Sequence, residues 1–155
     1  EADVKEYMVK LEKLRDEMLV LIEKDAECFK PLAAAYSLPS STDEEKAEKE
    51  KVMAEALLTA CSVPLEIMEK GLDICRILEE LAVKGSVMAI SDVAVGVEFV
   101  RTAVLGASMN VYINTKSMKQ RDEAEKINQK AEKLLEEGTK RADLVYEKVL
   151  SRLKK

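Results

Sequence analysis

The first fifth of the chain carries apolar residues at helical spacing. From Asp3 to about Lys30 the steps between them alternate between three and four residues, which is typical of one face of an amphipathic helix. Pro31 lacks an N–H and its ring clashes with the carbonyl four residues back, so we expect it to kink or end this helix. Residues 37–41 should then form a loop. The apolar stripe consists of Leu11, Leu14, Met18, Leu21, Cys28 and Leu32, and position 25, which completes it, is an aspartate.

A second long helix is predicted after this loop. Ser41 and Glu44 have the spacing of a capping box, in which the serine hydroxyl caps the backbone and the glutamate reaches back. Apolar positions become denser from Val52 onward. We expect Pro64 to bend this helix near its middle and Gly85 to cap its C-terminal end.

The segment from Ser91 to Asn114 is ambiguous, because its first residues alternate as they would in a β-strand. Two facts count against a strand. The segment is long and has no turn signal, and a lone strand among helices has no partner for its backbone groups. As a helix capped by Ser91, the segment is apolar nearly all round, as a central buried helix should be.

The remaining residues, from Ser117 to about Leu153, predict a long amphipathic helix, with Ser117 and Gln120 as a second candidate capping box. Four such helices predict an all-α fold, a bundle of long, kinked helices with a central buried helix. At 155 residues the chain has the length of one ordinary domain. We therefore expect a single helical domain over residues 1–155.

Composition narrows the classes of function. Charged residues interrupt every apolar run before the roughly 20 residues that a membrane span needs. The net charge of -5 is mild and the two signs are interleaved, so no basic face predicts a nucleic-acid partner. There are three widely spaced cysteines and no histidine, which leaves no zinc site; we expect buried, reduced thiols in a cytoplasmic protein. The seven methionines are expected to fill the core.

Asp25 is the first residue that could carry chemistry, because it stands on a face that should be apolar. Burying a carboxylate without a partner costs several kcal/mol unless its pKa rises, and a raised pKa suits a general acid or base near neutral pH. Two ordinary explanations remain open. Pro31 could rotate the seam of the helix, or Asp25 could pair with a buried Lys or Arg.

Asn110 and Asn114 lie four residues apart, hence on one face of the predicted buried helix, one turn beyond Gly106. Their amides could bind the donor and acceptor edge of a heterocycle, with Gly106 leaving room for it. They could equally bond a neighbouring helix or end their own. Asp92, at the start of the same helix, has a simple explanation, since acids are favoured at helix N-termini.

Six short motifs, in this order and spacing, resemble the formiminotransferase-cyclodeaminase family. The resemblance runs from about Leu14 to the C-terminus and is closer to the cyclohydrolase branch of the family than to the cyclodeaminases. It implies an all-helical homodimer that acts on the one-carbon unit between N5 and N10 of tetrahydrofolate. The motifs are Lys24-Asp25-Ala26-Glu27-Cys28-Phe29, Tyr36-Ser37-Leu38-Pro39, Val63-Pro64-Leu65, Gly85-Ser86, Ile90-Ser91-Asp92-Val93 and Asn110-Val111-Tyr112-Ile113-Asn114-Thr115-Lys116.

The resemblance also implies roles for single residues. The family's catalytic aspartate corresponds to Asp25, which would accept and later return one proton without a metal or nucleotide cofactor. Asn110 and Asn114 would orient the pterin or the bridging carbon, with Asp92 and Lys116 nearby. Lys116 would meet a folate carboxylate, or else stay solvated.

One part of the family pattern does not occur in this sequence. Members usually begin with a further helical segment that bears a Gly-Gly-Gly-Ser-like motif, and nothing similar stands upstream of Asp3. We therefore expect the domain to lack an upstream N-terminal segment. The alternative to a folate enzyme is a catalytically silent helical dimer, which would act as a folate-binding or structural module.

Overall fold

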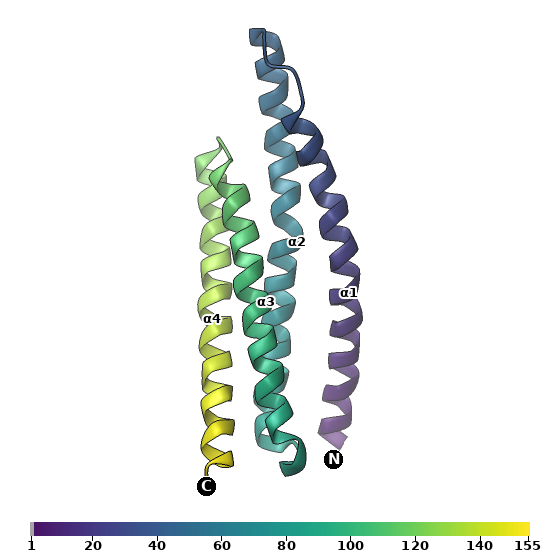
Figure 1. Cartoon of the computed structure of the whole chain (residues 1–155), viewed down its shortest axis with the longest axis vertical. Helices are drawn as coiled ribbons and strands as arrows, with labels where there is room; N and C mark the ends of the chain where they lie inside the picture. Colours follow the sequence, from purple (N-terminus) through teal and green to yellow (C-terminus); the bar gives the residue numbers. More distant parts are fainter. Residues whose placement is uncertain (1) are drawn as a thin grey trace.

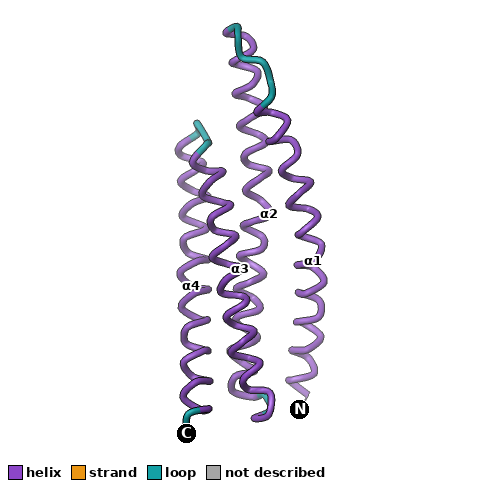
Figure 2. Tube along the Cα trace, in the orientation of Figure 1, coloured by secondary structure: helices purple, strands orange, loops and turns teal. Residues whose placement is uncertain are grey.

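The computed structural model describes residues 2–155, and these residues form four long α-helices that lie side by side along one axis (Figure 1). The helices alternate in direction, and both chain ends lie at the same end of the bundle. Within residues 2–155 there is no β-strand (Figure 2), which confirms the predicted all-α bundle. The elements are α1 (Ala2–Tyr36), α2 (Asp43–Lys84), the short 3₁₀ helix η1 (Val87–Ala89), α3 (Ile90–Lys116) and α4 (Arg121–Leu153).

The sequence left open whether Pro31 ends the first helix or only kinks it. In the structure α1 continues past Pro31 to Tyr36. Leu32 and Ala35, which follow the proline, are both buried and hold the last turns of α1 in place. Pro31 itself is exposed, so water can reach the carbonyl of Glu27, which has lost its helical donor. The apolar contacts after the proline therefore outweigh the missing hydrogen bond.

The second helix begins one residue later than predicted. Its cap is Thr42, whose hydroxyl accepts a hydrogen bond from the Glu45 amide at 3.2 Å. The Glu45 carboxylate in return accepts bonds from the amides of Thr42 and Ser41, at 3.1 and 2.7 Å. Glu45 thus satisfies two backbone donors at once, which explains why it, and not Glu44, completes the capping box. At the other end Gly85 is the cap, as predicted, and its N–H bonds to the carbonyl of Leu81.

The predicted caps of the last two helices are also wrong. Ser91 lies inside α3, and the serine that caps this region is Ser86, whose hydroxyl accepts the Met88 amide at the start of η1. Ser117 does not cap α4. Its hydroxyl donates back to the carbonyl of Ile113, so it closes α3, and α4 begins at Arg121 without a side-chain cap.

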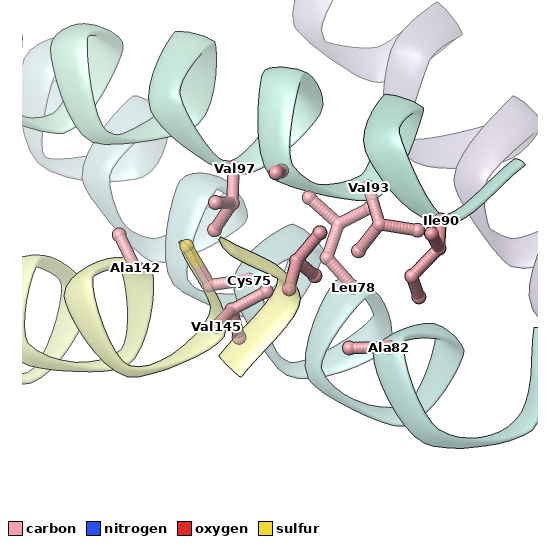
Figure 3. Packing of buried hydrophobic residues seen from close by; sticks show 10 residues of the cluster. Cys75, Leu78, Ala82, Ile90, Val93, Val97, Ala142 and Val145 are labelled. Atoms are coloured by element: carbon pink, nitrogen blue, oxygen red, sulfur yellow. The ribbon is translucent and has the colours of Figure 1, made fainter. Parts of the chain in front are cut away.

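Helix α2 packs against each of the other three long helices, whereas α1 packs against α2 alone. The core nearest the chain ends is built by α2, α3 and α4, with Cys75, Leu78, Val97 and Val145 pointing toward one another (Figure 3). The predicted central buried helix, α3, is buried only on its α2 and α4 sides. Its remaining side exposes a row of large apolar residues, Val95, Phe99, Met109 and Ile113.

Two other expectations can be compared with this fold. Among residues 2–155, no helix combines the length and the apolar character that crossing a membrane requires. The methionines are not all core filler, because Met8, Met88 and Met109 are exposed while Met68 and Met118 are buried.

Candidate functional site

Three of the residues singled out in the sequence meet in one pocket between α1, α2 and α3. Asp25 comes from α1, and Asn110 and Asn114 come from α3. The pocket has a volume of about 130 Å³, and we call it the Asp25 pocket. Its other lining residues are Phe29 of α1, Ala60 and Pro64 of α2, and Ile113 of α3.

Asp25 is held at the pocket by the apolar seam on either side of it. Leu21 and Leu32 are both buried, so the seam continues past position 25 and is not rotated away by Pro31. Asp25 itself is partly buried. Within residues 2–155 its carboxylate has no hydrogen-bond or ion-pair partner, and the neighbouring Lys24 pairs with Glu66 at 2.7 Å. Asp25 is therefore neither rotated off the buried seam by Pro31 nor paired with a buried Lys or Arg of the described residues.

Asn114 is oriented by an irregularity of α2. In a regular helix the carbonyl of Ala60 would accept the N–H four residues later, but that residue is Pro64, which has no N–H. The side-chain amide of Asn114 donates to this carbonyl instead, at 3.2 Å. The bond to a neighbouring helix, one of the alternatives left open above, is thus present. Because only the NH₂ group is engaged in it, the carbonyl oxygen of the Asn114 amide is left to accept a bond in the pocket.

Asn110 lies one turn before Asn114 on the same face of α3 and is exposed. In the described part of the chain, no protein group bonds to its side chain, so both its donors and its acceptor are available. The site therefore combines one carboxylate with two amides, one of them fixed and one free. This set can exchange a proton and can hold the polar edge of a planar ligand.

The other two predicted site residues do not line this pocket. Asp92 is exposed in the first turn of α3, and the rise of a helix places it about 27 Å from Asn110 along the same axis. Its position matches the simple explanation, an acid at a helix N-terminus. Lys116 is the last residue of α3, exposed, only two residues beyond Asn114.

The sequence did not predict Phe29, Ala60 and Pro64 as parts of the site. Pro64 was expected to bend α2 and belongs to one of the six motifs, but no role in the site was predicted for it. The signal that could have found the pocket is the combination of a proline inside a helix with an asparagine on a facing one, because the proline leaves a carbonyl that needs a donor.

The cysteines offer no nucleophile at this site. None of the three lines the Asp25 pocket, and all are free thiols. Burial raises the pKa of the Cys61 and Cys75 thiols to about 11, which keeps them protonated and unreactive near neutral pH. Among the residues that line the Asp25 pocket, Asp25 is the only one with an ionisable side chain.

Comparison with known proteins shows which family the chain belongs to. The family model described as formiminotransferase-cyclodeaminase matches residues 1–133. The chain belongs to this family. The resemblance given by the six sequence motifs is thereby confirmed.

Individual relatives from bacteria and animals are similar over most of the chain. A methenyltetrahydrofolate cyclohydrolase from Methylorubrum extorquens is 37% identical over 99% of this chain and 74% of its own length. Formimidoyltransferase-cyclodeaminases from Rattus norvegicus and Sus scrofa are 34% and 32% identical over 81% and 85% of this chain. The chain spans only 23% and 24% of those two proteins, so it corresponds to one part of them.

Proposed function

We propose that this family member makes or opens the 5,10-methenyl bridge of tetrahydrofolate, as a methenyltetrahydrofolate cyclohydrolase or a formiminotetrahydrofolate cyclodeaminase. The observation that carries the proposal is Asp25, a partly buried carboxylate without a protein partner, beside Asn110 and Asn114. The names of the relatives support the substrate, because each refers to folate hydrolysis or to cyclodeamination.

In the hydrolytic reaction, water attacks the methenyl carbon and the Asp25 carboxylate takes one of its protons, which leaves a hydroxyl group on a tetrahedral carbon. One carbon–nitrogen bond then breaks as the hydroxyl loses its proton to solvent and becomes the formyl oxygen, and the Asp25 carboxylic acid returns its proton to the leaving nitrogen. In the cyclising reaction, N10 attacks the formimino carbon and transfers its proton to Asp25, which gives it to the departing ammonia. One residue serves both routes, and neither route calls for a metal or nucleotide cofactor.

The substrate's orientation is assigned to the two asparagines. The free amide of Asn110 can pair with the donor and acceptor edge of the pterin. Asn114, whose NH₂ group is bonded to the Ala60 carbonyl, can present its oxygen toward the bridging carbon. Asp92 and Lys116 take no part in this proposal, because neither lines the pocket.

We extend the proposal to a cytoplasmic homodimer without a nucleic-acid partner. A pocket of about 130 Å³ is smaller than the roughly 300–1,000 Å³ of ordinary small-molecule sites. The Asp25 pocket alone therefore holds only part of a folate. Beside the pocket α1 and α3 expose large apolar residues, including Ile22, Phe29, Met109 and Ile113, that a second copy would cover.

The test is turnover of 5,10-methenyltetrahydrofolate and of 5-formiminotetrahydrofolate by the wild type and by Asp25→Asn. This substitution keeps the shape of the side chain but removes the acid–base group, so we expect kcat to fall by about 10²- to 10⁴-fold. Asp16→Asn is the matched control. It changes an exposed acid on the same helix that is paired with Arg15, and it should leave kcat unchanged.

Two results would count against the proposal, and they mean different things. If the wild type turns over neither substrate, the chain acts instead as a silent folate-binding or structural module. If Asp25→Asn keeps near-normal kcat, the chain is an enzyme but Asp25 is not its acid–base residue. Sedimentation of the wild type at the mass of a single chain would contradict the dimer alone.

A further inference from the structure

A second cavity, of about 290 Å³, lies farther along the bundle, between α2, the loop after α1 and the turn that joins α3 to α4. We call it the lysine pocket. Its floor is apolar and is formed by Met53, Ala54 and Leu57 of α2. Its rim is polar and consists of Ser40, Lys46, Lys49, Glu50, Ser117, Lys119 and Gln120.

Positive charge predominates around this rim, although the chain as a whole is acidic with a net charge of -5. The rim contains three lysines but only one carboxylate, that of Glu50, which pairs with Lys119. Lys46 pairs with Asp43, an exposed residue that does not line the pocket. The lysine pocket is thus an apolar slot with an excess of cations at its edge.

Lys49 supplies a charge that no carboxylate of the described residues neutralises. Its ammonium group donates to the carbonyl oxygens of Tyr36 at 2.8 Å and Leu38 at 2.9 Å. A lysine has three N–H donors, so one remains for a ligand. The two carbonyl bonds also fix the position of the ammonium, because they tie it to the loop that closes the pocket.

The lysine pocket and the Asp25 pocket lie along the same side of α2. On α2, Met53 and Leu57 of the lysine pocket stand in the same helical row as Ala60 and Pro64 of the Asp25 pocket. On α3, Ser117 follows Asn110 and Asn114 in the same way, at the end of the helix. The lysines therefore lie in the direction in which a ligand would extend from the Asp25 pocket along α2 toward the turn after α3.

We propose that the lysine pocket binds the p-aminobenzoyl-glutamate arm of the folate, with the aromatic ring over Met53 and Leu57 and the glutamate carboxylates at Lys49 and Lys119. This inference rests on the proposed function, since it places the rest of the same substrate. The arm spans roughly 10 Å at ordinary bond lengths. Helix α2 rises by about the same amount, roughly 10 Å, from Ala60 to Met53.

The arrangement predicts effects of opposite sign from two neighbouring residues. Lys119→Gln removes a cation and frees the Glu50 carboxylate, so the glutamate arm should bind more weakly. Glu50→Gln removes the competing anion and frees the Lys119 ammonium, so the arm should bind more tightly. Both changes should alter KM by about threefold or more and leave kcat unchanged, because neither side chain reaches the reacting carbon.

The experiment compares KM for 5,10-methenyltetrahydrofolate with KM for the carboxamide of 5,10-methenyltetrahydropteroate, which has neither the glutamate nor a benzoate carboxylate. Lys119→Gln should raise the first KM, Glu50→Gln should lower it, and neither should change the second. Lys51→Gln is the matched control, because Lys51 is exposed on the same helix and lines neither pocket. Equal effects of the variants on both substrates, or none on either, would overturn the proposal.

A binding measurement separates this proposal from the proposed function. Titration of the wild type with p-aminobenzoyl-glutamate should give saturable binding that p-aminobenzamide does not give and that Lys119→Gln weakens. This result would support the lysine pocket even if the wild type had no turnover. Absence of any binding by the fragment in an active wild type would instead reject the pocket and keep the enzyme. Lys49→Gln should weaken the same binding, and its melting temperature checks that the loop still closes.

Discussion

Helices α2 and α3 have one side closed by α4 and another only partly covered by α1. On the closed side, Val104 lies between two glycines, Gly71 of α2 and Gly138 of α4, which let the backbones approach closely. On the open side, the glycine of α3 is Gly106, and a Cβ added there would meet nothing within 4 Å. Glycine thus serves close packing on one side and leaves free space on the other.

The helices that cover these two sides, α4 and α1, differ in how many residues they bury and how many helices they contact. Helix α4 contacts both α2 and α3, and it buries six residues, Ala124, Ala131, Gly138, Ala142, Val145 and Val149. Helix α1 contacts only α2, and among residues 3–36 it buries only Leu21, Leu32 and Ala35. The asparagines therefore stand on a firmly packed helix, whereas Asp25 stands on one with a single neighbour. The pocket thus has one firmly packed wall, α3, and one wall, α1, that is held by a single neighbour.

The largest effect that the comparison predicts is on stability. In Gly71→Ala the new Cβ would lie 2.6 Å from Cγ2 of Val104, a buried and β-branched residue that has little room to move. We expect a loss of about 1–3 kcal/mol in the free energy of unfolding. Gly106→Ala meets no atom and should gain about 0.5–1 kcal/mol, because alanine is the better helix former.

Chemical denaturation of the two variants measures this difference directly. Since both changes replace a helical glycine by alanine, each serves as the control for the other. Equal destabilisation by both would mean that the interface of the proposed homodimer extends from Met109 over Gly106 and closes this side of α3.

A second prediction concerns Pro64, which leaves the carbonyl of Ala60 on the open side of α2 without its helical donor. Pro64→Ala restores the N–H that the Ala60 carbonyl lacks, so this carbonyl no longer needs the Asn114 side chain. The amide of Asn114 is then free to rotate. We expect kcat/KM to fall by about tenfold, the cost of losing one oriented hydrogen-bonding group, while the helix gains stability.

Pro31→Ala is the matched control for this change. Pro31 also lies inside a helix, but it is exposed and lines neither pocket. It should stabilise α1 without changing kcat/KM. If both proline variants lower kcat/KM to the same extent, the flexibility of the helices matters and the orientation of Asn114 does not.

The sequence predicted the four helices, the position of Asp25 on the seam and the common face of Asn110 and Asn114, because these follow from helical periodicity. Periodicity did not predict that the three residues share a pocket; only the family resemblance implied a common site. The shared pocket depends on which helices are neighbours. It also depends on the Ala60 carbonyl, and the periodicity of the sequence does not show that Asn114 of α3 supplies its missing donor. The predictions of the helix caps were wrong for a related reason. Neighbouring residues such as Glu44 and Glu45 fit the same capping pattern, and local geometry chooses between them.

The smallest predicted effect is a loosening of α1 at low pH. Part of the contact between α1 and α2 is ionic, with Glu17 and Lys70 paired at 2.6 Å. The hydrogen bond from Lys70 lowers the pKa of Glu17 below its ordinary value of 4.5. A carboxyl group with a lowered pKa stabilises the fold above its ordinary pKa, and this contribution is lost as the pH falls through the lowered value. Below pH 4.5, α1 should therefore loosen.

Helix α4 provides the comparison, because Glu137 pairs with Arg76 of α2 and its pKa is lowered as well. Its six buried residues should nevertheless keep α4 in place after this pair is lost. We expect hydrogen-exchange protection to fall in α1 before α4 as the pH is lowered from 6 to 3. Glu17→Gln should loosen α1 already at pH 6, whereas Glu137→Gln should change α4 less. Simultaneous loss of protection in both helices would mean that α1 is held as firmly as α4, and that the opening beside Asp25 is rigid.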